Sequence, residues 1–327
     1  MAVSTDSCKL AVIGTVTMLM LFATGCAQPQ RRSGRAVSLY VDAMILNEQN
    51  EKDEAIDRLI EAIKLDPQFA MAYSLKGDIH QEKGEYEDSA DSYEAATGLD
   101  PWSFKDFFNL GKVARIMEQF LRAVKAYVRA CELEPTHFGA HLGAANCYYK
   151  LEDYESAFEY TQIAEEIDPN SSEPQLLLAD IFEAQKDHEQ AIAAYRRALE
   201  IEGNKPQIMV PLARSYLRAR RFDTAKELLA TTIEADPNNS LAYQYLGYAH
   251  VILRDFDTAI VNYRKAIQTN PGDWAAQKGL GVACMFKAVR DNNDKALKEE
   301  AVRHWNTSLQ INPDQPKLRR LLEKYSK

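Results

Sequence analysis

Apolar and small residues recur at helical spacing in pairs of segments along most of the chain. In one pair the first segment runs from Leu142 to Leu151, a polar break follows at Glu152 and Asp153, and the second segment runs from Tyr154 to Ile167. Such spacing predicts an amphipathic helix in each segment. Pro169 then stops the second helix, because proline lacks an amide hydrogen and disfavours helix in the residue before it. Each pair of segments is therefore predicted to form a helix hairpin.

This hairpin pattern recurs with a period of 34 residues. Gly203 occupies the one position of the period that lacks a proline. A fixed period of this size is typical of a solenoid, in which each unit covers the hydrophobic side of the next unit. The recurring prolines are Pro67, Pro101, Pro135, Pro169, Pro237 and Pro271.

Small residues occupy three fixed positions of the period, and large aromatic residues occupy a fourth. Two helices approach closely only where neither carries a bulky side chain, and aromatic rings fill the space that remains. We therefore predict that all four positions are packed. The small residues of the first helix are Ala43, Gly77, Gly111, Ala145, Ala179, Ala213, Gly247 and Gly281. Those of the second helix are Ala55, Ser89, Ala123, Ala157, Ala191, Ala225, Ala259 and Ala301, followed by Ala62, Ala96, Ala130, Ala164, Ala198, Thr232, Ala266 and Ser308. The large residues are Tyr93, Tyr127, Tyr195, Tyr263 and Trp305.

This order of small, small, aromatic, small and proline residues resembles the tetratricopeptide repeat. The resemblance extends from Ala36 to about Asp314. It implies an all-α fold, a right-handed α-solenoid of about eight helix hairpins, with ligands bound in the concave face lined by the first helices. Residues 316–327 are predicted to form a capping helix with an apolar face toward the last repeat. The predicted repeats are 36–69, 70–103, 104–137, 138–171, 172–205, 206–239, 240–273 and 274–315.

Three repeats depart from the family pattern. Repeat 1 has Asp42 and Lys52 where the family has leucine and an aromatic residue, as suits an end unit with a solvated face. In repeat 6, Pro206 and Pro211 predict a first helix that starts late, near Val210. Repeat 8 contains eight extra residues near 289–296, which predict a turn, a helix cap and a longer second helix.

The first 25 residues differ from the repeats, because a run without charge extends from Leu10 to Gly25. The run is shorter than the roughly 20 apolar residues of a membrane span, which favours an export signal. It ends in Ala23-Thr24-Gly25-Cys26, which resembles a bacterial lipobox. The resemblance implies a signal peptide at 1–25 and lipidation of Cys26, for example by palmitate. An ordinary signal peptide and an uncleaved anchor are the alternatives.

Residues 26–35 are polar and include Pro29 and Gly34, which oppose helix, so we predict a short linker there. Ala27 follows the cysteine, and no aspartate stands at that position. By resemblance to sorting in Gram-negative bacteria, this favours the outer membrane, with the protein facing the periplasm. Three arginines in the linker form either a solvated tether or a contact to anionic headgroups.

Composition and motifs point away from nucleic acid and catalysis. The formal net charge of −9 makes the chain a poor nucleic-acid binder. The sequence has no glycine-rich phosphate loop, no His-Glu-x-x-His motif and no paired-cysteine metal spacing. The helically spaced pair His137 and His141 lacks a third metal ligand. We therefore predict a non-enzyme without metal, cofactor or small-molecule substrate. Cys131 and Cys147 are expected to be core residues, with a disulfide between them as an open alternative.

The concave face implied by the resemblance contains a basic patch in repeats 3 and 4 and an apolar stripe in repeats 7 and 8. The basic patch would hold an acidic peptide segment or a C-terminal carboxylate, although Phe108 stands where the family's carboxylate clamp has a lysine. The stripe would receive a hydrophobic helix or strand, unless the capping helix covers it. The predicted groove residues are Lys105, Phe108, Lys112, Arg115, Asn146, Tyr149, Lys150, Arg214, Arg218, Tyr248, Ile252, Met285 and Phe286.

Together these features predict a non-enzymatic protein-interaction scaffold, tethered to a bacterial membrane, that binds partner peptides or helices in its groove. Assembly of a pilus, a secretion machine or another envelope complex would suit such a scaffold. Two alternatives stay open. One is a substrate-recruiting subunit of an enzyme complex whose catalytic residues lie on another chain, and the other is a structural homo-oligomer.

Overall fold

The computed structural model of the protein describes residues 27–292 and 294–325. Every regular element in these ranges is a helix, so the predicted all-α class is confirmed. The residues divide into two compact units, Met1–Tyr160 and Thr161–Lys327, which we call the N-terminal half and the C-terminal half. Cys26 and the predicted signal peptide lie outside the described residues.

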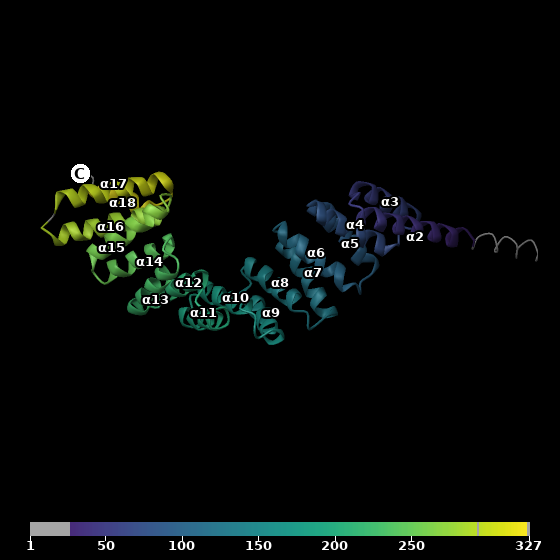
Figure 1. Ribbon diagram of the computed structural model, residues 1–327, viewed down its shortest axis with the longest axis horizontal. Helices are drawn as coiled ribbons and strands as arrows, with labels where there is room; N and C mark the ends of the chain where they lie inside the picture. The colour runs from purple at the N-terminus through teal and green to yellow at the C-terminus, as the bar shows by residue number, and fades with distance from the viewer. Residues whose placement is uncertain (1–26, 293, 326–327) are drawn as a thin grey trace, which may run out of the picture. The chain divides into compact units, whose positions relative to one another are not determined.

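Consecutive helices pack together as hairpins within each half, and each hairpin packs on the next (Figure 1). The N-terminal half contains α2 (Ala27–Glu48), α3 (Lys52–Leu65), α4 (Ala70–Lys83), α5 (Tyr86–Leu99), α6 (Phe104–Ile116), α7 (Phe120–Leu133) and α8 (Phe138–Lys150). The division between the halves falls within α9 (Tyr154–Ile167). The C-terminal half continues with α10 (Glu173–Ala184), α11 (His188–Glu202), α12 (Pro206–Arg218), α13 (Phe222–Ala235), α14 (Ser240–Ile252), α15 (Phe256–Thr269), α16 (Trp274–Arg290), α17 (Lys295–Ile311) and α18 (Pro316–Tyr325).

The predicted packing positions are buried in every repeat. All residues of the three small sets and all five large aromatic residues are buried. Helix hairpins close at these points: the Ser89 hydroxyl donates a hydrogen bond of 2.8 Å to the backbone carbonyl of Gly77 on the facing helix. The buried Tyr93 ring ends in a hydroxyl that donates to Asp78 at 2.7 Å, so its polar end is satisfied.

The turn inside each hairpin has a feature that the hydrophobic pattern did not reveal. One residue of each turn has a φ between 56° and 77°, in the left-handed region that L-residues rarely adopt. Only repeat 2 has glycine there. The residues are Asn50, Gly84, Glu118, Glu152, Lys186, Arg220, Arg254 and Asn292.

Two predicted helix starts are wrong. The described part of the stretch expected to be a linker, from Ala27 onward, is helical and belongs to α2. In repeat 6 the first helix begins at Pro206 rather than near Val210, and Pro211 lies inside it. Pro206 is accommodated at the first helical position, because the backbone amide there has no helical partner.

The eight extra residues of repeat 8 lengthen both helices rather than only the second. Helices α16 and α17 each contain 17 residues, whereas α14 and α15 of repeat 7 contain 13 and 14. The predicted helix cap is Asp294, whose carboxylate accepts hydrogen bonds from the amides of Ala296 and Leu297.

The predicted capping helix forms as α18. Leu318 is 2% exposed and shares a hydrophobic cluster with Trp305, Leu280 and Met285, while Leu321 is exposed. Burial of this one face gives the last repeat the cover that a terminal unit needs. In the part of the chain that the structure describes, no helix combines the length and hydrophobicity of a membrane span.

Candidate partner-binding groove

The C-terminal half contains a groove of about 540 Å³, built by the first helices of repeats 6, 7 and 8. Successive first helices α12, α14 and α16 lie side by side, because the small residues of each hairpin let the next hairpin approach. All lining residues except Tyr263 of α15 belong to these three first helices. We call this surface the C-terminal groove. Its lining is Arg214, Leu217, Arg218, Gln244, Tyr245, Tyr248, Val251, Ile252, Tyr263, Ala275, Lys278, Gly279, Val282 and Phe286.

The apolar part of the C-terminal groove is open to solvent. Tyr248, Ile252 and Phe286 are 45%, 42% and 51% exposed, although all three belong to helices whose other faces are packed. A second hollow of about 470 Å³ adjoins the groove and shares Ile252 and Phe286 with it. There the Phe286 ring stacks on Phe256, with ring centroids 5.6 Å apart. Contiguous exposed apolar surface of this kind is typical of an interaction site.

Basic side chains flank this apolar surface. Arg218 forms an ion pair with Glu183 of α10, which is buried. Lys278 Nζ lies 4.8 Å from the centroid of the Trp274 ring, and no carboxylate in the described part of the chain pairs with it. Burial lowers the pKa of Lys278. Arg214 is partly buried and its Nε has no hydrogen-bond partner among the described residues.

Glu183 anchors the edge of the groove nearest repeat 5. The Ser215 hydroxyl donates to its carboxylate at 2.5 Å, and His188 Nδ1 lies 3.3 Å from the same oxygen. Burial alone would raise the pKa of Glu183, but the bonds from Ser215, Arg218 and His188 outweigh it and lower that pKa. The carboxylate therefore stays charged and holds Arg218 in place.

Of the six groove residues predicted in the C-terminal half, five line the C-terminal groove and one does not. Arg214, Arg218, Tyr248, Ile252 and Phe286 all line the C-terminal groove. Met285 does not, because it is 6% exposed and belongs to the hydrophobic cluster that the capping helix covers. No residue of α18 lines the groove, so the capping helix leaves the rest of the predicted stripe uncovered.

Several lining residues were not predicted. Lys278 and Gly279 are adjacent on α16, and Tyr245 precedes Tyr248 on α14. The spacing of Lys278 and Phe286, two helical turns apart, is the sequence signal that places them on one face.

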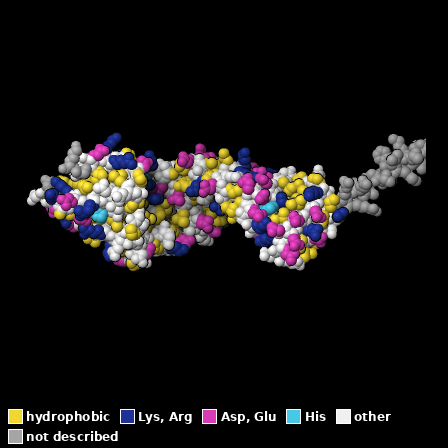
Figure 2. All heavy atoms as spheres, turned by 90° about the horizontal axis from the view of Figure 1, so that it is seen from above, with side chains coloured by type: hydrophobic (Ala, Val, Ile, Leu, Met, Phe, Trp, Pro, Cys, Tyr) yellow, Lys and Arg dark blue, Asp and Glu magenta, His cyan; other side chains and the backbone are white. Residues whose placement is uncertain are grey.

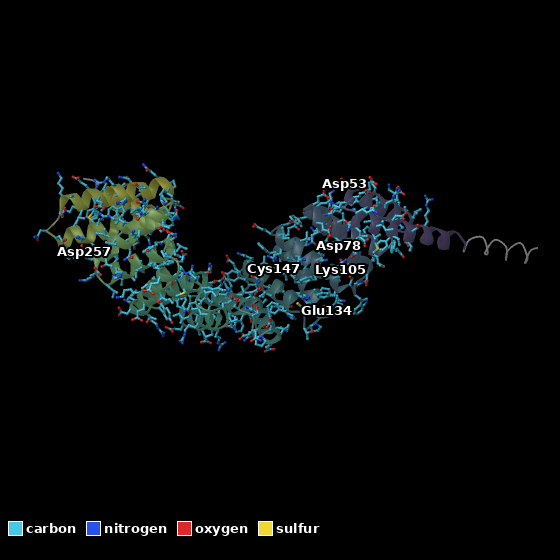
Figure 3. All side chains as sticks on the ribbon, viewed as in Figure 1. Asp53, Asp78, Lys105, Glu134, Cys147 and Asp257 are labelled. Atoms are coloured by element: carbon cyan, nitrogen blue, oxygen red, sulfur yellow. The ribbon has the colours of Figure 1, made fainter. Side chains whose placement is uncertain are left out.

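The predicted basic patch of the N-terminal half is occupied by contacts within the chain. Lys105 Nζ lies 2.5 Å from Asp78 (Figure 3), and Lys112 lies over the Phe108 ring. Asn146 donates to the carbonyl of Leu142 in its own helix at 2.8 Å. The remaining predicted residues of this patch are Arg115, which lies beside the buried Tyr127, and Lys150, which lies over the Tyr149 ring.

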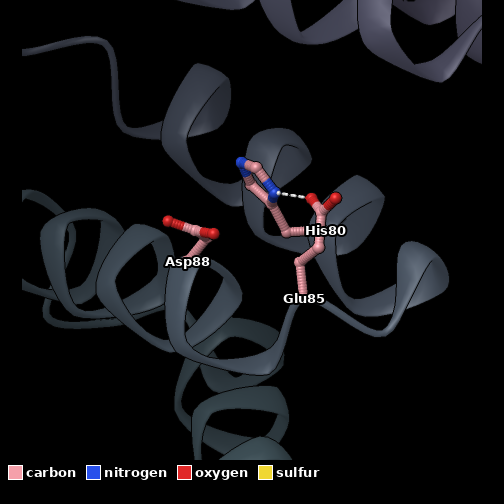
Figure 4. A group of neighbouring side chains, drawn as sticks. All are labelled: His80, Glu85 and Asp88. Atoms are coloured by element: carbon pink, nitrogen blue, oxygen red, sulfur yellow. Dashed lines mark hydrogen bonds and ion pairs between the residues drawn. The ribbon is translucent and has the colours of Figure 1, made fainter.

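One group of side chains has the ligand types of a metal site. His80, Glu85 and Asp88 place ligand atoms within 4.8 Å of one another (Figure 4). Lys83 Nζ, however, lies 2.7 Å from Glu85, and His80 Nδ1 lies 2.7 Å from the other oxygen. The bond from Lys83 and, to a smaller extent, the bond from His80 lower the pKa of Glu85. The lysine ammonium already supplies the positive charge beside this carboxylate, so the group is explained as a turn held by ion pairs.

The histidines and cysteines singled out in the sequence have structural surroundings. His137 caps α8 by accepting a hydrogen bond from the Ala140 amide, and His141 Nε2 lies 2.9 Å from the Pro135 carbonyl. Cys131 and Cys147 are buried free thiols, so the disulfide alternative is not supported. Burial raises the pKa of Cys131 to about 12 and that of Cys147 to about 11.

Two solved structures with TM-scores above 0.5 share the fold of this chain at low sequence identity. A chain of the APC/C hetero-tetramer Cut9–Hcn1 is 14% identical with a TM-score of 0.55, over 84% of this chain and 53% of that one. A tetratricopeptide repeat protein from Parabacteroides merdae is 13% identical with a TM-score of 0.51, over 76% of this chain and 99% of that one. YrrB, described as a tetratricopeptide-repeat protein with an unusual peptide-binding site, is 17% identical with a TM-score of 0.48. The match covers 62% of this chain and 100% of that one.

Comparison with sequences identifies the family. No curated protein sequence matches the chain. A family model matches residues 35–280, which include most of the predicted repeats. The 34-residue period, the buried small positions and this match agree, and the predicted tetratricopeptide repeats are confirmed. The chain belongs to the tetratricopeptide-repeat family described as the cilia and flagella-associated protein 70 C-terminal domain.

Proposed function

We propose that the protein is a non-enzymatic interaction scaffold that binds a segment of a partner protein in the C-terminal groove. The observation that carries the proposal is the groove itself: a hollow of about 540 Å³ with a solvent-exposed apolar floor on a packed helical scaffold. A peptide in helical or extended form would bury Tyr248, Ile252 and Phe286 and gain the hydrophobic free energy of that area.

The scaffold is also proposed to be anchored to a bacterial membrane through a lipid on Cys26. The support is the sequence Ala23-Thr24-Gly25-Cys26 after an uncharged run. The first predicted repeat starts at Ala36, ten residues after Cys26, so the repeats would start close to the membrane surface. A tethered scaffold facing the periplasm suits the assembly of an envelope complex such as a pilus or a secretion machine.

Site-specific photo-crosslinking of the full chain in its native cells tests the binding function. A photo-reactive phenylalanine analogue at Ile252 should give a discrete crosslinked product. The same analogue at Val261 of α15 is the control, because Val261 is 56% exposed and lies outside the groove lining. Tyr248→Asp combined with Phe286→Asp should remove the product from position 252 while the variant stays folded, since about half of each side chain is exposed. Equal products from positions 252 and 261 would contradict the proposal.

A further inference from the structure

The charges that line the C-terminal groove are all of one sign. Arg214, Arg218 and Lys278 are cationic, and none of the described residues that line the groove is acidic. The chain as a whole has the opposite balance, with 39 basic and 48 acidic residues. On the face of the molecule drawn in Figure 2, basic and acidic side chains are interspersed. The groove is thus a local exception to the surface around it.

Lys278 lacks the carboxylate partner that partly buried cations normally have. Arg218 pairs with Glu183. Arg214 has no carboxylate at ion-pair distance among the described residues, but against the effect of burial Tyr245 and Glu183 raise its pKa. Lys278 pairs with no described carboxylate and lies over the Trp274 ring. Withdrawing a cation from water without a counter-charge costs free energy, and the lowered pKa of Lys278 reflects that cost. Arg214 is attached to α12 and Lys278 to α16, and the apolar side chains of α14 lie between those helices.

We propose, on the basis of the function proposed above, that the occupant of the C-terminal groove is a peptide segment in which a carboxylate stands beside large apolar side chains. The apolar side chains would cover Tyr248, Ile252 and Phe286, and the carboxylate would pair with Arg214 and Lys278. Such a pair would replace water around two cations that already lie against apolar surface, where charge-assisted hydrogen bonds are strongest. Charge complementarity of this kind favours specificity as well as affinity.

Peptide selection tests this assignment while the natural partner is still unidentified. A phage-displayed library of random 16-residue peptides is selected on the full chain, and in parallel on the variant with Tyr248→Asp and Phe286→Asp. We expect peptides that are enriched on the natural chain and lost on the variant, with Asp or Glu next to Leu, Phe or Trp in their consensus. Groove-dependent peptides without acidic enrichment would overturn the carboxylate assignment and leave the binding function standing. The absence of groove-dependent peptides would overturn the proposed function itself.

A charge-removal cycle with the strongest selected peptide tests the two named cations. Replacing its acidic residue by the amide should weaken binding about tenfold or more, and Lys278→Gln or Arg214→Gln should do the same. The amide peptide should bind these variants about as well as it binds the natural chain, because the carboxylate contact is then already lost. Lys265→Gln on the exposed face of α15 is the matched control and should leave affinity within about twofold. Additive losses in the cycle would show that the carboxylate contacts other residues.

Discussion

A methyl group placed on Gly143 would stand 2.6 Å from Cζ of Tyr127. Gly143 belongs to the first helix of repeat 4, and Tyr127 to the second helix of repeat 3. The Tyr127 ring is 2% exposed and also contacts the position of Gly111 in its own repeat. The ring is thus held between two glycines, and this contact joins neighbouring repeats.

Gly143→Ala is therefore expected to destabilise the N-terminal half by about 1–3 kcal/mol, because the added methyl forces the Tyr127 ring or a helix to move. Gly98→Ala is the matched control. Gly98 lies in α5 with no atom within 4 Å of an added methyl, so alanine should stabilise that helix by about 0.5–1 kcal/mol. Urea unfolding of both variants measures the difference. A neutral Gly143→Ala variant would show that the ring has room to move.

The left-handed turn residues predict an unusual stabilising substitution. Glu152 has a φ of 62° and an exposed side chain. Glycine adopts this conformation without steric cost, so Glu152→Gly should stabilise the chain by about 0.5–1 kcal/mol despite the larger entropy of the unfolded state. Glu159→Gly, in the interior of α9, should instead cost about 1 kcal/mol. Thermal melts compare the two variants, and destabilisation by both would contradict the turn geometry.

The sequence predicted the packing far better than the ends of the helices. Alanine or glycine at a contact between helices is a direct steric requirement, so a period read from Ala145 or Ala157 locates the core. A proline near a helix start is ambiguous, since Pro206 can either precede a helix or occupy its first turn. In the structure Pro206 occupies the first turn of the longer helix, because this helix buries Ile208, Met209 and Val210.

The position of the C-terminal groove and most of its predicted residues agree with the structure, but Met285 does not line it. One step along a helix rotates a side chain by about 100°, so neighbours on α16 face different surroundings. Phe286 is half exposed, whereas Met285 is buried in the cluster to which α18 contributes Leu318. The position of α18 could not be read from the repeat pattern of α16, and neither could the lack of a partner for Lys278.

The bonds of Glu183 predict a pH-dependent contribution to stability. Glu183→Gln should lower the stability of the C-terminal half by about 1–3 kcal/mol at pH 7, less than for a fully buried ion pair because Arg218 is about half exposed. The folded-state pKa of Glu183 is lowered, so its contribution is present above the unfolded-state value of about 4.3 and is lost as the pH falls through the folded value. The deficit of the variant should therefore shrink at acidic pH.

Urea midpoints at pH 7, 5 and 3.5 measure this effect. Glu189→Gln is the control, because Glu189 pairs with Arg221 at 2.6 Å on the surface. Such an exposed pair contributes at most about 1 kcal/mol. A Glu183→Gln deficit that stayed constant from pH 7 to pH 3.5 would mean that the contribution of Glu183 does not come from its charge.

The proposed lipid anchor predicts where the protein is found after cell fractionation. Several acyl chains hold a protein stably on a membrane, whereas one chain gives only reversible binding. Cys26→Ser should therefore move the protein from the membrane pellet to the soluble fraction, and metabolic labelling with an alkyne-bearing palmitate should be lost with it. Cys8→Ser is the control and should change neither result, because Cys8 precedes the uncharged run. A Cys26→Ser protein that stays in the pellet would leave the uncharged run, Leu10 to Gly25, as the anchor.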